Sequence, residues 1–166
     1  MNISKVGTND VYAFYPTFEQ VLCHEFPGYT SKVIEYLLSI YTPSSFLYWI
    51  QKDLKTVLCV IIAGKVVGFA VIDQPYGGVS LCRWLGITKE NQRQGIGKEI
   101  INKWEELARA EGCHKMEVAS QPEAKGFYEK VGLTLEGKRS RSYFGIDQYI
   151  FGKVLSEPHD EVMTKY

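Results

Sequence analysis

ITKENQRQGIGKEII, residues 87–101, is the stretch in which an apolar strand gives way to an amphipathic helix through a turn that contains Gly95 and Gly97. A helix that begins on bare backbone presents unpaired N–H groups and the positive end of its dipole, a combination that binds phosphate. A side chain at either glycine would hold a bulky anion away from the backbone. The cations Arg93 and Lys98 add positive charge beside the turn. The stretch therefore predicts a phosphate-binding loop.

Two other phosphate motifs do not fit these letters. A dinucleotide-binding loop requires GxGxxG, but the position three residues after Gly97 is Ile100. A P-loop requires Gly-Lys followed by Ser or Thr, but Gly97 and Lys98 are followed by Glu99. Both motifs are excluded.

The letters match the pattern Gln/Arg-x-x-Gly-x-Gly/Ala, here QRQGIG at residues 92–97. This pattern resembles the acetyl-CoA pyrophosphate loop of the GNAT superfamily of N-acetyltransferases. A second segment, AKGFYEKVGL at residues 124–133, is similar to the family signature A-x-x-F-Y-E-K-x-G-F and follows an expected strand at 114–120. The resemblance covers about residues 56–155, and two motifs in the expected order support each other.

The resemblance implies an acyl-CoA N-acyltransferase fold of the mixed α/β class. Its sheet is mostly antiparallel, with about seven strands flanked by about four helices. Residues 1–166 would form a single N-acetyltransferase domain with a frayed tail at 156–166. The implied reaction moves the acetyl group of acetyl-CoA directly to a primary amine in a ternary complex, without a metal. The residues implied in cofactor binding are Leu85, Gly86, Ile87, Gln92, Arg93, Gln94, Gly95, Ile96, Gly97, Lys98, Gln121, Ala124 and Tyr128.

Tyr128 stands where many family members carry the general acid for the departing thiolate. A phenol with a pKa of ~10 is protonated at neutral pH and has a proton to give. The alternative is that Tyr128 only packs or hydrogen-bonds the cofactor sulfur. Phe127 is expected to point the other way, into the core. Gln121 occupies the place of a family Asn that holds the pantetheine arm, and it carries the same amide on a longer side chain.

The general base is open among several residues. Glu117 and Asp147 are the leading carboxylates, Asp73 and His24 are further candidates, and a relay of ordered water needs none of them. The family builds its acceptor pocket from the N-terminal helices and the last loop. Aromatic side chains in those regions would line the pocket or pack in the core, and they are Phe14, Tyr15, Tyr29, Tyr41, Trp49, Tyr143 and Phe144.

The composition narrows the function classes. The chain has 166 residues, 45% hydrophobic content and a formal net charge of zero, which fits one packed domain and gives no basic excess for nucleic acid. The short cluster Lys138-Arg139-Arg141 is interpreted first as a solvated strand or turn and second as a contact for phosphate or an acidic substrate. No apolar run of ~20 residues and no signal core occurs, so we expect no membrane association and a cytoplasmic protein.

Four widely spaced cysteines without a CxxC pair indicate reduced thiols rather than a zinc site. The expected partner is a small-molecule or peptide amine, and a homodimer is compatible with the sequence. Two alternatives stay open: a non-catalytic acyl-CoA-binding module, and a protein N-terminal or lysine acetyltransferase of the same fold.

Hydrophobic periodicity and turn residues predict the order of elements. The expected elements are a strand at 2–6, two helices between 17 and 54 that separate at Pro43, a hairpin of strands 56–62 and 66–72, a strand at 79–87, a helix from the glycine loop to Gly112, a strand at 114–120, a short helix ending near 131, and strands at 133–142 and 148–155.

Overall fold

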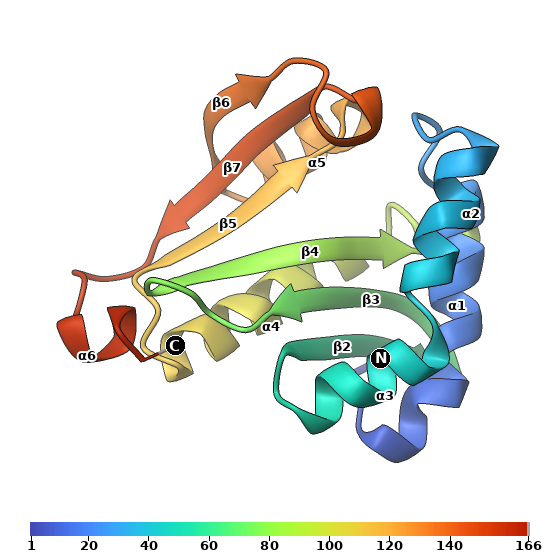
Figure 1. Ribbon diagram of the computed structural model, residues 1–166, viewed down its shortest axis with the longest axis horizontal. Helices are drawn as coiled ribbons and strands as arrows, with labels where there is room; N and C mark the ends of the chain where they lie inside the picture. Colours follow the sequence, from blue (N-terminus) through green and yellow to red (C-terminus); the bar gives the residue numbers. More distant parts are fainter. Residues whose placement is uncertain (166) are drawn as a thin grey trace. The chain divides into compact units, whose positions relative to one another are not determined.

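The computed structural model describes residues 1–165 and contains a seven-stranded sheet in the order β1-β2-β3-β4-β5-β7-β6 (Figure 1). This is the mixed α/β architecture expected from the sequence, with six α-helices over the described residues instead of about four. The strands are β1 Asn2–Lys5, β2 Lys55–Ile62, β3 Lys65–Asp73, β4 Val79–Ile87, β5 Lys115–Ser120, β6 Thr134–Arg139 and β7 Gln148–Val154. The helices are α1 Val11–His24, α2 Ser31–Ile40, α3 Pro43–Gln51, α4 Ile96–Ala110, α5 Lys125–Lys130 and α6 Asp160–Met163.

The chain forms two compact units. The first comprises Met1–Ile72 and Trp84–Ile100, and the second comprises Asp73–Arg83 and the chain from Ile101 onward. Strand β4 and helix α4 each contribute residues to both units. The single domain expected from the sequence stays a prediction.

The first unit begins its helices earlier than the sequence predicts. Helix α1 starts at Val11 and runs through Pro16, although the expected helical region started at Thr17. Proline removes one helical donor and crowds the preceding turn, but the buried side chains of Val11 and Phe14 lie before it and anchor that turn. The two expected helices that separate at Pro43 are present as α2 and α3, whereas α1 was not expected as a separate helix.

The next two helices and the hairpin follow local rules. Thr30 and Thr42 cap α2 and α3 by accepting backbone hydrogen bonds from Val33 and Ser45. The β2–β3 hairpin turns at Ala63 and Gly64, both with positive φ (49° and 77°), as two-residue hairpin turns require. The core of this unit is aromatic, and its fully buried rings are Phe14, Phe18, Phe46 and Phe69.

In the second unit, β4 and β5 pair in parallel from Val79↔Lys115 to Cys82↔Val118. Strand β7 pairs antiparallel with β5 and with β6, and Figure 1 shows it lying between them. The indole N–H of buried Trp104 on α4 donates to Ser80 Oγ at 2.8 Å. This bond satisfies two buried polar groups where the helix covers β4.

The C-terminal segment is more ordered than expected. Instead of a frayed tail, it carries α6, and Val162 lies so close to Gly112 that a Cβ there would come within 2.9 Å of it. Residue 166 of the expected tail lies outside the described residues. Within residues 1–165, no helix combines the length and the apolar character needed to cross a membrane.

Candidate active site

The loop at residues 92–98 follows β4 and the 3₁₀ turn Lys89–Asn91 and includes the first residues of α4. Its backbone twice takes the left-handed conformation. The φ angle is +59° at Arg93 and +82° at Gly95. A Cβ added to Gly95 would meet no heavy atom within 4 Å. Glycine is therefore favoured here by backbone conformation rather than by packing, and the space beside it is open.

The helix start presents donors in that open space. The first recorded bond at the start of α4 runs from the Glu99 N–H to the Gly95 carbonyl at 3.2 Å. The N–H groups of residues 96–98 precede this donor and have no acceptor within the helix. Arg93 and Lys98 are exposed on either side. Unpaired donors, the helix dipole and two cations together form an anion-binding site in this unit.

Two glutamines of the loop use their side chains to brace it. Gln92 Nε2 donates to Glu25 Oε2 at 2.7 Å and to the Ile87 carbonyl at 3.1 Å. Gln94 Nε2 donates to the Glu90 carbonyl at 2.9 Å. Both residues were predicted to bind cofactor, and in this structure their amide nitrogens hold the loop to its own neighbours. Glu25 was missed by sequence reasoning.

The end of β4 is shaped by close packing. A Cβ on Gly86 would lie 2.5 Å from Val21 Cγ1 and 2.8 Å from Phe69 Cζ, so only glycine fits. Leu85 and Ile87, on either side of it, are half-buried. The register of β4 with β5 is given by its first four residues, and residues 85–87 follow this paired part of the strand.

Tyr128 on α5 is buried, with 5% of its surface exposed. Its ring centroid lies 5.6 Å from that of Phe151 on β7. Burial, reinforced by the charge of Cys82 as a thiolate, raises the pKa of Tyr128 above its ordinary value near 10. The phenol therefore keeps its proton through neutral pH. Phe127 was expected to be the core residue of the pair, but it is only half-buried, so that expectation is wrong.

Gln121 precedes the 3₁₀ turn Pro122–Ala124 that leads into α5. Its side-chain atoms Oε1 and Nε2 are both buried, and neither has a hydrogen-bond partner within the described chain. A buried carboxamide without partners costs free energy that a bound group would recover. The Ala124 N–H donates to the Gln121 carbonyl at 3.1 Å and fixes the turn.

The two carboxylates proposed as base are both engaged in the second unit. Glu117 lies 3.6 Å from Lys115 Nζ. Asp147 accepts the Arg141 N–H at 2.8 Å and lies 3.0 Å from Lys138 Nζ. The Arg141 hydrogen bond, with Lys138 beside it, lowers the pKa of Asp147, which makes it a weaker base. Their catalytic role stays a prediction.

The two further base candidates have different surroundings. Asp73 accepts the Arg83 Nε–H at 3.0 Å within the second unit. His24 is the exposed last residue of α1. Neither observation identifies a general base for the reaction.

The predicted acceptor aromatics separate into three groups. Phe14 is core, with 1% exposed, whereas Tyr143 and Phe144 are exposed to 67% and 43%. The remaining ones are half-buried in the first unit, and two of them pack on a tryptophan that sequence reasoning missed. The ring centroid of Trp84 lies 5.5 Å from Tyr41 and 6.2 Å from Tyr29. Phe26 was not predicted from the sequence either, and its ring centroid lies 5.4 Å from that of Trp84.

The four cysteines are free thiols, and three of them are buried. Burial raises the pKa of Cys113 to about 11 and also raises the pKa values of Cys59 and Cys23. Thiols with raised pKa values are poor nucleophiles at neutral pH. Over the residues that the structure describes, no group of three or more His, Cys, Asp or Glu side chains is placed to hold a metal.

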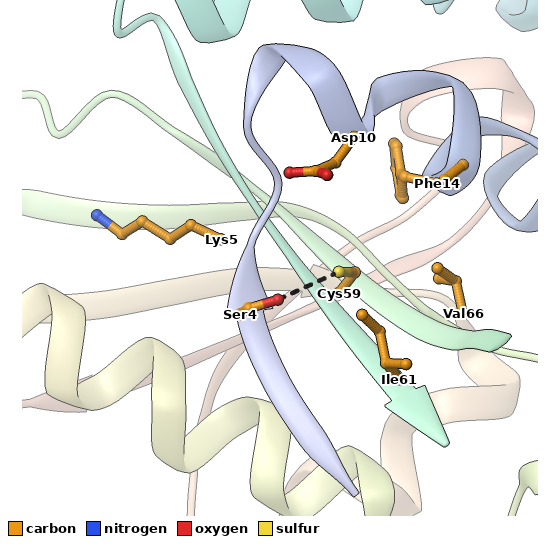
Figure 2. Close-up of a pocket in the computed structure, with 8 residues that line it drawn as sticks. Ser4, Lys5, Asp10, Phe14, Cys59, Ile61 and Val66 are labelled. Carbon is orange, nitrogen blue, oxygen red and sulfur yellow. Dashed lines mark hydrogen bonds between the residues drawn. The ribbon is translucent and has the colours of Figure 1, made fainter. Parts of the chain in front are cut away.

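A cavity of ≈ 130 Å³ lies in the first unit beside β1 (Figure 2). Figure 2 shows the side chains of Ser4 and Cys59 pointing toward each other, with Asp10 above them. The Ser4 Oγ and Cys59 Sγ atoms lie 3.8 Å apart. Its other lining residues are Lys5, Ala13, Phe14, Ile61 and Val66. None of the predicted cofactor-binding residues lines this cavity.

Comparison with known proteins identifies the class of this chain. It matches the sequence profile of the acetyltransferase (GNAT) family over residues 17–133. The chain belongs to this family, which confirms the resemblance in the sequence. It is thus an acyltransferase of the class that moves an acetyl group from acetyl-CoA to nitrogen.

Solved structures share the fold. A PaiA N-acetyltransferase from Thermoplasma acidophilum, in complex with coenzyme A, has a TM-score of 0.78 at 18% identity, over 93% of this chain and 98% of that one. A GNAT acetyltransferase from Streptococcus pneumoniae has a TM-score of 0.74 at 22% identity, over 93% and 99%.

The ribosomal-protein-S18-alanine N-acetyltransferase from Escherichia coli has a TM-score of 0.72 at 18% identity, over 96% of each chain. No sequence among the curated proteins matches the chain.

Proposed function

We propose that this acetyltransferase binds acetyl-CoA through the loop at residues 92–98 and transfers the acetyl group directly to a primary amine. The observation that carries the proposal is the start of α4, where unpaired N–H groups of residues 96–98 stand beside the open, left-handed Gly95. Phosphate groups are the ligands that such a helix start binds best. The PaiA N-acetyltransferase of similar fold was crystallised in complex with coenzyme A.

A second observation concerns Gln121, which the family resemblance assigns to cofactor binding. Its buried and unpartnered carboxamide offers a donor and an acceptor, which is what an amide-containing arm such as pantetheine requires. The family resemblance assigns Gln121, Ala124 and Tyr128 to the same cofactor as the loop, together with backbone groups of residues 85–87. Acetyl-CoA, when bound, supplies an acetyl thioester.

The chain's own groups have separate roles in the proposed reaction. The backbone N–H groups at the start of α4, with Arg93 and Lys98, hold the negatively charged end of the cofactor. Tyr128, whose pKa is raised by burial, donates its proton to the leaving thiolate. The braced side chains of Gln92 and Gln94 keep the loop in its conformation before the cofactor arrives, which lowers the entropic cost of binding.

The acceptor is proposed to be a primary amine on a small molecule or a peptide. The E. coli neighbour acts on an alanine of a ribosomal protein by its name, and the present chain shares only its fold. A cytoplasmic location is proposed from the four free cysteines, which suit a reducing compartment.

The first test is thermal unfolding with acetyl-CoA, coenzyme A, NAD and ATP in turn. A ligand at 100 times its Kd adds about 2.7 kcal/mol to the stability, so we expect a rise of several degrees with the two coenzyme A species. Gly95→Glu should abolish the rise, because it places a negative side chain where the pyrophosphate binds. Its matched control is Gly64→Glu, which has a similar positive φ of 77° and open space around it. A retained shift in Gly95→Glu would refute the loop assignment.

A further inference from the structure

Glu25 is a carboxylate held in place at both its backbone and its side chain. It directly follows α1, and its N–H donates to the Val21 carbonyl at 2.8 Å. Its Oε2 accepts the Gln92 amide at 2.7 Å, and the same nitrogen donates to the Ile87 carbonyl at 3.1 Å. The Glu25 carboxylate and the Ile87 carbonyl therefore accept hydrogen bonds from the same atom, Gln92 Nε2. Glu25 lies at the end of β4.

The charge of this carboxylate is not neutralised by the described chain. Gln92 is an uncharged donor, and no cation within residues 1–165 forms an ion pair with Glu25. An ionised carboxylate has about four lone-pair sites, so acceptor capacity remains after the Gln92 bond. The residue is half-buried rather than fully solvated. A half-buried, unpaired negative charge attracts an ammonium group.

A cluster of rings begins at the next residue. Phe26 follows Glu25 in the chain, and its ring lies 5.4 Å from Trp84 and 5.9 Å from Tyr29. Trp84 precedes Ile87 by three residues on β4, which corresponds to about 10 Å along an extended strand. Phe26 and Tyr29 are half-buried. The Glu25 carboxylate and the rings of Phe26 and Tyr29 thus belong to the same region of the first unit, beside the second half of β4.

We infer that Glu25 binds the ammonium group of the acceptor and takes up its proton, while Phe26 and Tyr29, which pack against the buried Trp84, contact an aromatic or bulky apolar group on the same acceptor. The inference rests on the proposed function, because it places the amine at the end of β4, where the family resemblance implies that residues 85–87 bind the cofactor. It names a base that lies in the first unit rather than among Glu117 and Asp147.

The proton count closes with Glu25 in this role. Glu25 takes one proton from the acceptor ammonium, either directly or through one water, and leaves a neutral amine with a lone pair. That lone pair forms the C–N bond of the amide as the C–S bond of the thioester breaks, and Tyr128 gives the thiolate a proton. The amide nitrogen then loses its second proton, which restores Tyr128 through solvent, and Glu25 releases the first proton to water.

The test compares Glu25→Gln with wild type in acetylation of 2-phenylethylamine, followed by thiol release between pH 7 and pH 10. Glutamine keeps the size of the Glu25 side chain and an oxygen that accepts the Gln92 hydrogen bond, but it cannot take up a proton. We expect acetyl-CoA affinity by calorimetry to stay within about twofold, and kcat/KM at pH 7 to fall by about 100-fold or more. The loss should shrink as the pH approaches the pKa of the amine, near 10, because the amine then loses its proton unaided. Glu35→Gln, on the exposed face of α2, should behave as wild type.

A purely structural role would give a different pattern. If Glu25 only braces Gln92, Glu25→Gln would lower kcat/KM equally at every pH or weaken acetyl-CoA binding, and the inference would be wrong. Should Glu25→Gln fail to fold, Glu25→Asp carries the test. Aspartate retains a titrating carboxylate, so the pH dependence should persist at a reduced rate, and its loss would overturn the role as base.

The contact between the aromatic side chains and the acceptor is tested by comparing two amines. We expect wild-type kcat/KM for 2-phenylethylamine to exceed that for ethylamine by at least about tenfold, because a phenyl group buries apolar surface. Tyr29→Ala should narrow this ratio. Equal values for both amines would overturn the acceptor class. If acetyl-CoA stabilises the protein but neither amine is acetylated, this inference fails alone; if acetyl-CoA gives no stabilisation, the proposed function fails as well.

Discussion

At the scale of single residues, Tyr128 illustrates how surroundings select a chemical role. It is enclosed by Phe151 and leaves 5% of its surface exposed. Burial disfavours the phenolate and raises the pKa of this tyrosine. A phenol that stays protonated throughout the working pH range has a proton available and does not suit the role of base, although its raised pKa makes it a weaker acid toward the thiolate.

Tyr128→Phe tests this role with little structural change. We expect kcat for the amine acceptor to fall by about 10- to 1000-fold, because general acid catalysis is lost, while the Kd of acetyl-CoA changes by less than about twofold. Steady-state thiol release and calorimetry measure the two quantities. Tyr143→Phe is the control, since Tyr143 is 67% exposed. An unaltered kcat would remove Tyr128 from the mechanism.

Which site residues could be predicted depended on whether they lie in local motifs. The loop at residues 92–98 and Tyr128 stand in short stretches whose spacing is visible in the letters. Glu25 is 67 residues from its partner Gln92, and no local pattern announces a contact across that separation. The core position expected for Phe127 was wrong, because helical spacing does not say which of two adjacent rings faces the sheet.

At the scale of elements, β4 packs closely against α1 and β3 at Gly86. Gly86 lies against Val21 of α1 and Phe69 of β3, at distances that leave no room for a Cβ. Gly68 on β3 faces the Gly86 carbonyl, 3.2 Å from where its own Cβ would be. Two glycines on adjacent strands thus allow the chain segments around residues 85–87 to approach closely.

Gly86→Ala should destabilise the protein by about 1–3 kcal/mol, the usual cost of overpacking a core. Urea unfolding followed by circular dichroism would measure the change. Gly137→Ala on β6 is the matched control, because its Cβ would meet nothing within 4 Å and it is also in a strand. Equal stabilities of the two variants would contradict the close packing at Gly86.

Most elements were predictable because their signals are local. The turn at Ala63-Gly64 and the stop at Gly112, both with positive φ at glycine, follow from the sequence alone. The start of α1 was not predictable, since Pro16 argues against a helix there and only the tertiary burial of Phe14 overrides it. The ordered α6 likewise depends on Val162 reaching Gly112, 50 residues earlier in the chain.

At the scale of the whole molecule, stability should depend on alkaline pH. Cys113 is 1% exposed, and burial raises its pKa to about 11 from an ordinary value near 9. Above pH 9 the unfolded chain loses this proton while the folded chain keeps it, so folding is disfavoured progressively up to pH 11.

We expect the free energy of unfolding to fall between pH 9 and pH 11 by about 1–3 kcal/mol more in wild type than in Cys113→Ala. Urea titrations at several pH values would give the two slopes. The slope is the informative quantity, because the cavity left by alanine shifts the stability equally at every pH. Parallel curves would show that Cys113 titrates normally in the folded protein.

The placement of the tryptophan side chains allows the fluorescence of the two units to be distinguished. The chain has three tryptophans, of which Trp49 and Trp84 belong to the first compact unit and Trp104 to the second. Trp104 is fully buried with its N–H bonded to Ser80, and Trp84 is 8% exposed among other rings. Fluorescence of a Trp104→Phe protein would come from the first unit alone, and its difference from wild type would isolate the second. The unfolding of each unit is therefore separately visible without any attached dye.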